Sequence, residues 1–383
     1  MRNLLVVVLF SGFCLAATDP VYKGLRDAAI QESFPVENLV IRRDAGTLTL
    51  KSGTLGLTAP QMGRDTVAVF SGDGEFTFTP GLGMEQTYLK SLTGKTSVQE
   101  RFDRALFCFT DSTGKEVRGK SKPGGDAKLD EILRDFRKHL RRRSDTIRSL
   151  VEAEVNSDFM DNIEAEILTD LYNAEAAGFF SAYLHGRSHS DLRFHVKPRG
   201  VMPSLPSPEE VGVINLDPGG ETDGIWYLSH FSDELSKGTA SSAENKRSVL
   251  AQNYKIETAI ASNDHFNAST ELSFKAMRAD RVIKFALKST LRVTKVSSGG
   301  KDIDFIQEDK KEDGTLYVIL PENLKEGASG TLRIEYAGDK IVHKEGGGNF
   351  SVSARESWYP NVNTFRDHAT YDLTFRVPKK YTL

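Results

Sequence analysis

Short runs in which apolar residues occupy every second position recur along this chain. Such runs are typical of β-strands, because alternate side chains of a strand point to opposite faces of a sheet. One stretch alternates at Leu48 and Leu50 and again at Leu55 and Leu57. The same spacing returns in the C-terminal third at Tyr254/Ile256, Leu272/Phe274, Ile283/Phe285/Leu287, Leu316/Val318/Leu320 and Leu332/Ile334/Tyr336. The pattern predicts a mainly β protein.

The region from Glu37 to Asp111 is expected to be a β-rich domain. Within "DTVAVFSGDGEFTFTP", the glycines of Gly72-Asp73-Gly74 are a hairpin signal, so we expect two strands around a turn there. "MEQTYLKSL" predicts one short helix, and "RALFCF" predicts a further strand.

A helical insert is expected after Gly124-Gly125. From Asp126 the apolar residues keep helical spacing, and a second helix is expected to start near Asp161, since Asp161 and Glu164 have capping-box spacing. "GFFSAYLHGRSHSDLRFHVKP" then predicts a hairpin whose turn runs from Gly186 to Asp191, and "GIWYLSHF" predicts a strand.

The fold class expected from these patterns is mainly β with a helical insert (α+β). Residues 233–248 hold clustered small polar residues and a single leucine, which indicates a linker. The expected organisation is a signal peptide at 1–17, an N-terminal β-rich domain at 18–120, a helical segment at 121–175, a β-rich segment at 176–232, the linker at 233–248 and a β-domain at 249–383.

The N-terminus has the features of a secretory signal peptide. Arg2 precedes an apolar run from Leu4 to Phe10, which is too short to span a bilayer, and small residues follow. We expect cleavage near Ala16 or Ala17 and a periplasmic or extracellular protein, the alternative being an N-terminal membrane anchor. Cleavage would leave Cys108 as the only cysteine, which excludes an intramolecular disulfide and a multi-cysteine zinc site.

Charge gives little support for nucleic-acid binding. The net charge is −3 over 383 residues, with both signs interspersed, so no nucleic-acid partner is expected. One basic helix is expected at 134–148, with Arg134, Arg137, Lys138, Arg141, Arg142, Arg143 and Arg148. Such a helix can meet an anionic membrane surface, although a basic run is also the ordinary solvated face of an amphipathic helix.

The histidines do not form a recognisable catalytic or metal motif. His185 and His189 are four residues apart, as in a helical metal pair, but the glycine, serine and aspartate around them favour an exposed hairpin tip. Cys108, His230 and His368 lie in strand-like segments and are interpreted as structural. No phosphate loop and no GxSxG motif are present. We therefore expect no catalytic, cofactor-binding or metal-binding residue in this chain.

The last third of the chain, from about residue 250 to 383, resembles the N-terminal β-domain of the aminopeptidase N family of zinc metallopeptidases. The resemblance is carried by an ordered series of segments rather than one motif. The segments are "YKIETAI", "NASTELSFKAM", "VIKFALKSTLRVTKVSSGGKDIDF", "LYVILPENLKEGASGTLRIEYAGDK" and "ARESWYPNVNTFRDHATYDLTFRVPKKY". The family's substrate-contacting glutamine has no counterpart near Ala354, so no binding residue is carried over.

The resemblance implies an antiparallel β-sandwich that precedes a catalytic domain. In the family that domain carries HExxH and a later glutamate, which hold zinc and activate water. No HExxH occurs in this sequence, so the chain alone is expected to be non-catalytic, with zinc only in a following domain. The implied partners are that catalytic zinc domain, in cis, and a peptide substrate of the whole enzyme.

The end of the sequence bears on the same interpretation. Tyr371, Leu373, Phe375 and Val377 alternate with polar residues, so we expect them to form one buried face of a strand. The chain then stops where the family's catalytic domain begins, which predicts a fragment of a larger enzyme. The alternative is a complete envelope binding or scaffolding protein made of β-domains. A third hypothesis, a new hydrolase in the N-terminal half, rests only on scattered histidines.

Overall fold

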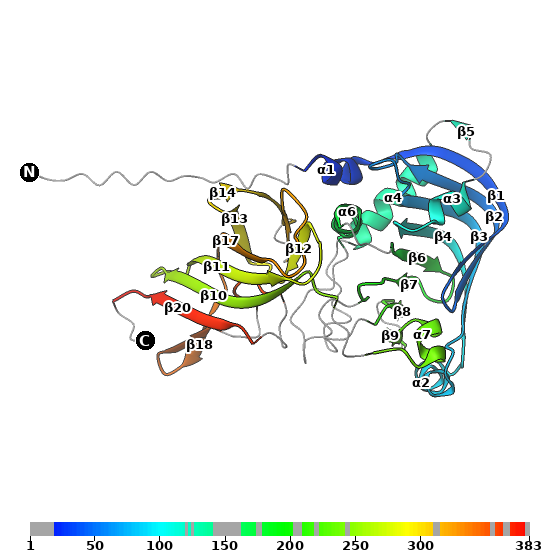
Figure 1. Cartoon of the computed structure of the whole chain (residues 1–383). Coiled ribbons are helices and arrows are strands. Elements are labelled where there is room, and N and C mark those ends of the chain that lie inside the picture. Colours follow the sequence, from blue (N-terminus) through cyan, green and yellow to red (C-terminus); the bar gives the residue numbers. More distant parts are fainter. Residues whose placement is uncertain are drawn as a thin grey trace, which may run out of the picture.

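The computed structural model describes residues 19–118, 122–123, 126–140, 162–173, 178–201, 209–217, 222–241, 246–308, 315–352, 357–362 and 368–379. The signal peptide expected at 1–17 and residues 141–148 of the basic stretch lie outside them. Within the described residues the protein is mainly β with a few helices, as the sequence predicts. Two β-rich parts lie side by side, and helices occupy the space between them (Figure 1).

The first part is a nine-stranded sheet in which every pair of neighbours is antiparallel. Apart from the short strand β5, sequence neighbours are also neighbours in space. In spatial order the strands are β5 (Lys122–Pro123), β1 (Ile30–Arg43), β2 (Gly46–Thr58), β3 (Val67–Phe78), β4 (Val98–Phe109), β6 (Phe180–Gly186), β7 (Leu192–Val196), β8 (Val211–Asn215) and β9 (Gly224–Ser229).

This sheet curls so that strands far apart in its order meet on one face. The ring centroid of Phe76 in β3 lies 5.1 Å from that of Phe194 in β7, and Phe78 lies 4.7 Å from Tyr227 in β9. A Cβ atom on Gly46 would lie 2.3 Å from the Phe194 ring, so only glycine fits at the start of β2. The enclosed face forms an aromatic-rich core of its own.

The hairpin turn predicted at Gly72-Asp73-Gly74 is wrong, because β3 runs straight through these residues. Gly72 lies beside Gly53 in β2, where the two backbones approach so closely that a Cβ on Gly72 would lie 2.1 Å from the Ser52 carbonyl oxygen. A Cβ on Gly74 would lie 2.2 Å from the Phe102 ring. These glycines therefore permit close packing inside a long, bulged strand rather than a change of direction.

Helices cover the opposite face of the nine-stranded sheet. Val67 and Val69 of β3 and Leu106 and Cys108 of β4 point to this side and pack on three helices. The three are α1 (Pro20–Asp27), α4 (Ala127–Leu140) and α6 (Ile163–Tyr172). The shorter helices are α2 (Gly83–Thr93), which confirms the predicted helix, α3 (Thr113–Val117) and α7 (Ser232–Lys237).

Two helix boundaries differ from the expectation. The N-cap of α6 is Asn162, whose side-chain oxygen accepts from the Ala165 amide at 3.1 Å, so the predicted cap at Asp161 is one residue too early. Helix α7 begins at Ser232 and occupies the first residues of the segment 233–248 that was expected to be a linker. No helix among the described residues is both long enough and apolar enough to span a bilayer.

The C-terminal part is a β-sandwich. A six-stranded sheet has the order β14-β13-β17-β11-β10-β20, and a three-stranded sheet has the order β12-β16-β15. Apolar residues of both sheets share one core. The strands are β10 (Val249–Ile260), β11 (Phe266–Ala276), β12 (Val282–Phe285), β13 (Leu291–Ser298), β14 (Lys301–Asp302), β15 (Asp304–Ile306), β16 (Leu316–Ile319), β17 (Ser329–Gly338) and β20 (Thr370–Arg376), with the separate hairpin β18 (Val342–Gly346) and β19 (Asn349–Val352).

The three-stranded sheet is buried on both faces. Leu316 and Val318 of β16 point into the sandwich core, whereas Tyr317 and Ile319 point the other way, toward the helices. The core on that side also contains Leu168 of α6, so it runs across the junction between the two parts. The N-terminal part therefore serves as the outer cover of this sheet.

Polar contacts reinforce the junction. The side-chain oxygen of Asn173, which follows α6, accepts from the backbone amides of Arg281 and Val282 at 2.8 and 3.0 Å. The Arg281 guanidinium lies 4.3 Å from the ring centroid of Tyr172. The two Arg199 Nη atoms donate hydrogen bonds to the carboxylate of Asp280, which is fully buried, at 2.5 and 2.7 Å. Both backbone and charged groups thus hold the two parts together.

Candidate functional site

The two histidines of the HGRSH segment lie at the predicted hairpin, His185 near the end of β6 and His189 in the turn before β7. His185 Nδ1 is 3.0 Å from Asp103 Oδ1, and His189 Nδ1 is 2.6 Å from Glu100 Oε2. The rings therefore engage different carboxylates on β4. Among the described residues these two histidines do not belong to any group of three metal-binding side chains. The hairpin predicted for this segment is confirmed by the antiparallel pairing of β6 with β7.

Cys108 lies in the core, as the sequence predicts. Its side chain faces α4 and α6 from β4 and is 1% exposed. Burial raises the pKa of the thiol well above its ordinary value, so the reactive thiolate is disfavoured. The arrangement suits an inert packing residue.

Of the described basic residues of the stretch, Arg137 is used within the protein, whereas Arg134 and Lys138 are exposed. The Arg137 guanidinium lies 3.0 Å from Glu164 and donates to the Leu25 and Ala28 carbonyls at 2.8 Å each, which ties α4 to α6 and α1. His139 Nε2 is 2.7 Å from Asp191 Oδ2. Arg137 therefore faces the interior of the protein, and the predicted membrane contact would have to come from the other basic residues of the stretch.

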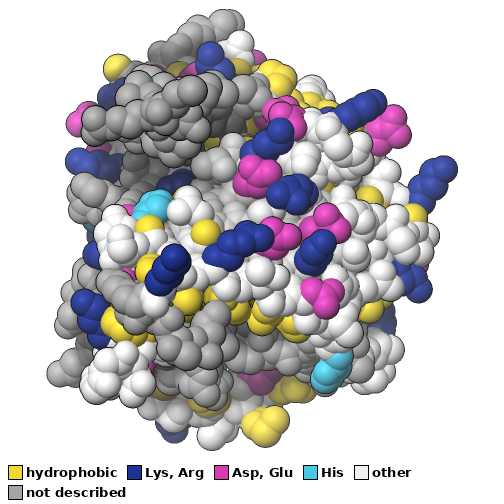
Figure 2. All heavy atoms as spheres, turned by 90° about the vertical axis from the view of Figure 1, so that its left-hand side faces the viewer, with side chains coloured by type: hydrophobic (Ala, Val, Ile, Leu, Met, Phe, Trp, Pro, Cys, Tyr) yellow, Lys and Arg dark blue, Asp and Glu magenta, His cyan; other side chains and the backbone are white. Residues whose placement is uncertain are grey.

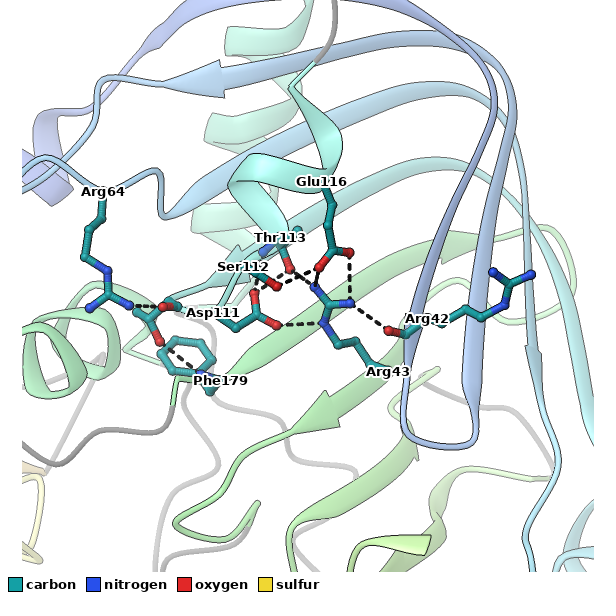
Figure 3. Close-up of polar contacts among 9 residues, drawn as sticks. Arg42, Arg43, Arg64, Asp111, Ser112, Thr113, Glu116 and Phe179 are labelled. Carbon is teal, nitrogen blue, oxygen red and sulfur yellow. Dashed lines mark hydrogen bonds and ion pairs between the residues drawn. The ribbon is translucent and has the colours of Figure 1, made fainter. Parts of the chain in front are cut away.

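A second charged cluster surrounds Arg43, at the end of β1 (Figure 3). Its guanidinium donates to Asp111 at 2.6 Å, to Thr113 at 2.6 Å and to both oxygens of Glu116 at 3.0 Å. Burial alone lowers the pKa of Arg43, but the bonds to Glu116 and Asp111 raise it overall. Because every direction of the guanidinium is occupied, the cluster holds the β1–β2 hairpin against α3 and offers no site for a ligand.

The edge strand β20 carries an exposed apolar surface. β20 runs parallel to β10, with Tyr371 beside Tyr254 and Leu373 beside Ile256, so these side chains share one side of the sheet. Tyr254 and Ile256 are each 1% exposed, whereas Tyr371 is 44% and Leu373 48% exposed. The apolar side of the six-stranded sheet is thus covered at β10 but exposed to solvent at the neighbouring edge strand β20. We call Tyr371 and Leu373 the β20 face.

The buried face predicted for Tyr371, Leu373, Phe375 and Val377 is therefore wrong. The alternation is present in β20, but Tyr371 and Leu373 are exposed and Phe375 and Val377 are only partly covered. Among the described residues no strand pairs with the outer edge of β20, so its backbone groups on that side are also available.

Aromatic stacking fixes the position of the β20 face. The Tyr371 ring stacks on Tyr254 with centroids 5.3 Å apart and planes 11° apart. Tyr359 packs edge-on against both, and its hydroxyl lies 3.0 Å from the Tyr371 hydroxyl. Burial and this hydrogen bond raise the pKa of Tyr359, so it stays neutral. Packed tyrosine rings with hydroxyl groups at their edge are suited to contact with another protein surface.

The side of the molecule formed by the C-terminal part is otherwise polar. Figure 2 shows Lys, Arg, Asp and Glu side chains mixed over its centre, with hydrophobic side chains gathered in a band below them. Ion pairs occur on the outer side of the sheet, with Arg333 Nε 3.2 Å from Glu335 and an Arg376 Nη 3.6 Å from Glu257. Such a mixed charged surface is typical of a solvated face.

One cluster has the composition of a metal site. Glu210, His230 and Glu234 place one ligand atom each within 4.8 Å of one another. From the sequence alone His230 is interpreted as structural, and neither glutamate stands out. The four-residue spacing of His230 and Glu234 was the available signal, but the part played by Glu210 depends on the pairing of β8 with β9.

No family model and no curated protein matches the chain. Among solved structures, the chain is similar to the M1 zinc metallopeptidase from Deinococcus radiodurans at 20% identity, over 35% of this chain and 33% of that one, with a TM-score of 0.29. A mutant of that enzyme bound to a Tyr-Ser-Ala substrate matches at 21% identity with the same coverages and TM-score. The match spans one third of these structures, and likeness at this identity concerns the fold alone.

Proposed function

We propose that this chain is the non-catalytic N-terminal portion of an exported aminopeptidase N-like zinc metallopeptidase. In this proposal residues 249–383 pack on a zinc-binding catalytic domain and help to shape the site for the peptide substrate. The observation that carries the proposal is the β20 face, where Tyr371 and Leu373 extend the apolar side of the sheet beyond its cover. A domain that followed β20 would lie against this face and its free edge.

The placement of the family-like segments supports the same proposal. "YKIETAI" lies in β10, "NASTELSFKA" in β11, "TLRIEYAG" in β17 and "TYDLTFR" in β20. Four segments quoted for the resemblance thus become four neighbours, β17-β11-β10-β20, of one sheet. Trp358 and Tyr359, from the last quoted segment, join the aromatic cluster at the sheet edge.

The chemistry of peptide hydrolysis is assigned to the following domain. The sequence holds no HExxH, so this chain does not supply the family's zinc ligands or its water-activating glutamate. In this proposal the chain contributes a rigid sheet beside the substrate site. β10 and β11 pair over eleven residue positions, and both are largely buried on one side.

The direct test is hydrolysis of amino-acid p-nitroanilides by the purified chain with and without added zinc. We expect no turnover in either case. Zinc-dependent turnover that survives removal of contaminating peptidases would overturn the proposal.

A second candidate is a complete binding or scaffolding protein of the cell envelope. The observation that favours it is the core shared by α1, α4, α6 and the three-stranded sheet, which joins the two parts into one unit without a further domain. The two candidates differ in whether the native protein is longer than this chain, and the reading frame after Leu383 distinguishes them.

A further inference from the structure

The cluster of Glu210, His230 and Glu234 is built by the register of one hairpin. Glu210 directly precedes β8 and His230 directly follows β9, and Val211 pairs with Ser229 in the last rung between them. The next residues, Glu210 and His230, therefore face each other, with Glu210 Oε2 3.0 Å from His230 Nδ1. Helix α7 begins two residues later and brings Glu234, four residues after His230, back to the same place.

Glu210 has an oxygen whose hydrogen-bonding capacity is not used. Its side chain is fully buried, and among the described residues Oε1 has no hydrogen-bond partner, although Lys246 Nζ lies 3.6 Å away as an ion-pair contact. The neighbouring residue Glu209 also has a buried oxygen, Oε2, that no described residue hydrogen-bonds. Buried carboxylate oxygens are costly when unpaired, so a further cation at this place would be stabilising.

The charges around the cluster also favour a cation. Glu210 and Glu234 contribute two carboxylates and Lys246 contributes one ammonium, so carboxylates outnumber ammonium groups in the cluster. A cation would therefore be attracted to this place.

We propose that Glu210, His230 and Glu234 bind a divalent transition-metal ion, for which zinc is the best match. One imidazole and two carboxylates are a mixed nitrogen and oxygen set that suits zinc, whereas magnesium and calcium favour oxygen ligands alone. Three protein ligands leave the fourth tetrahedral position to water. This site is separate from the HExxH zinc site of the proposed catalytic domain.

The three ligand atoms need to move only slightly closer together to bind zinc. Zinc–ligand distances of about 2.0–2.2 Å place tetrahedral ligands roughly 3.5 Å apart. The three atoms here lie within 4.8 Å, so the cluster must contract by about 1 Å to bind zinc. Glu234 is only partly buried and sits on the short helix α7, so its side chain is the one that can move.

The location suggests what the ion would do. Glu210 and His230 lie at the end of the last hairpin of the nine-stranded sheet, and Lys246 lies three residues before β10 begins. A bound ion would therefore fix α7 against the hairpin at the point where the chain passes to the C-terminal part.

The experiment is titration of the metal-stripped chain with zinc by calorimetry, followed by cobalt substitution and absorption spectroscopy. We expect one tight equivalent of zinc and a visible cobalt spectrum typical of four-coordination. Glu234→Gln should weaken zinc binding at least about tenfold, as expected for loss of a carboxylate ligand. Because Glu234 is partly exposed, this variant is expected to fold.

Two further variants keep the test specific. Lys246→Met removes the competing cation, so we expect it to tighten zinc binding. His189→Ala, which removes a histidine paired with a different carboxylate, should leave zinc binding unchanged. Equal zinc affinity of the unmodified chain and Glu234→Gln, absence of a tight equivalent, or loss of zinc with His189→Ala would each overturn the assignment. Zinc bound without anilide hydrolysis is the expected combination, so this result is separable from the test of the proposed function.

Discussion

Tyr371 stacks on Tyr254 across the only parallel strand pair among the described strands, with ring centroids 5.3 Å apart and planes 11° apart. One ring of this pair is 1% exposed and the other 44%. The pair thus marks the line at which the covered apolar face of the C-terminal sheet becomes an exposed one. The proposed docking of a further domain depends on this boundary.

The exposure of Leu373 predicts that it contributes little to the stability of this chain. Leu373→Ala should lower the free energy of unfolding by less than about 1 kcal/mol, because about half of its side chain already contacts water. The matched change Leu332→Ala, at a fully buried position of the same sheet, should cost about 2–5 kcal/mol. Urea unfolding measures both. Equal losses would show that the β20 face is already covered.

Asn173 is expected to be important at the junction between the two parts. Asn173→Ala removes the acceptor of two backbone amides, those of Arg281 and Val282, and should cost about 2–4 kcal/mol. Asn323→Ala is the matched control, since the exposed Asn323 amide donates to the Tyr172 and Ala279 carbonyls at the same junction. The control should cost less than about 1 kcal/mol. Similar losses in the two variants would contradict the structure of the junction.

Gly72 distinguishes the long strand from the predicted turn. Gly72→Ala places a Cβ 2.1 Å from the Ser52 carbonyl oxygen, and this clash with backbone should cost at least about 2 kcal/mol. Gly83→Ala, at the first residue of α2 where a Cβ meets nothing within 4 Å, should be neutral or stabilising by up to about 1 kcal/mol. Thermal unfolding compares them. A harmless Gly72→Ala would restore the turn interpretation.

The ion pair of Asp191 predicts a pH dependence of stability. Burial alone raises the pKa of Asp191, but Arg193, whose Nε and Nη2 lie 2.8 and 2.9 Å away, and His139 lower it well below its usual value. Because the folded-state pKa is below the unfolded-state value of about 3.9, the stabilisation is present above that pH and is lost as pH falls below it.

Asp191→Asn should therefore cost about 3 kcal/mol near pH 7, since it removes the buried negative charge that pairs with the Arg193 guanidinium. The difference from the unmodified chain should shrink as pH falls below about 4. Urea unfolding at several pH values measures this difference. Asp103→Asn, in an exposed pair with His185, is the control and should change stability by less than about 1 kcal/mol. A difference for Asp191→Asn that stays constant with pH would contradict the assigned ion pair.

Local patterns in the sequence predicted much of the fold. The alternating pairs became strands, and the helical spacing after Asp126 became α4. The failures have a common physical reason, because alternation shows which side chains share a face but not what covers that face. Leu316 and Val318 were identified as one buried face of β16, but Tyr317 and Ile319 on its other face were not, although a continuous apolar run is typical of a strand covered on both sides.

The glycines and the metal cluster also show that local sequence patterns do not specify which strands become neighbours. Gly72 permits either a turn or a close approach of two strands, and only the neighbouring strand decides between them. His230 and Glu234 are close in sequence, but Glu210 joins them through the β8–β9 register, which no local pattern specifies.

The measurement that tests the central proposal most directly is the mass of the native protein in its source cells, detected with an antibody raised against residues 253–383. This chain has a mass of 42.4 kDa before any cleavage of a signal peptide. We expect a band much heavier than this, since a catalytic domain would follow the β20 face. A band at or slightly below 42.4 kDa would contradict it and favour the complete envelope binding or scaffolding protein.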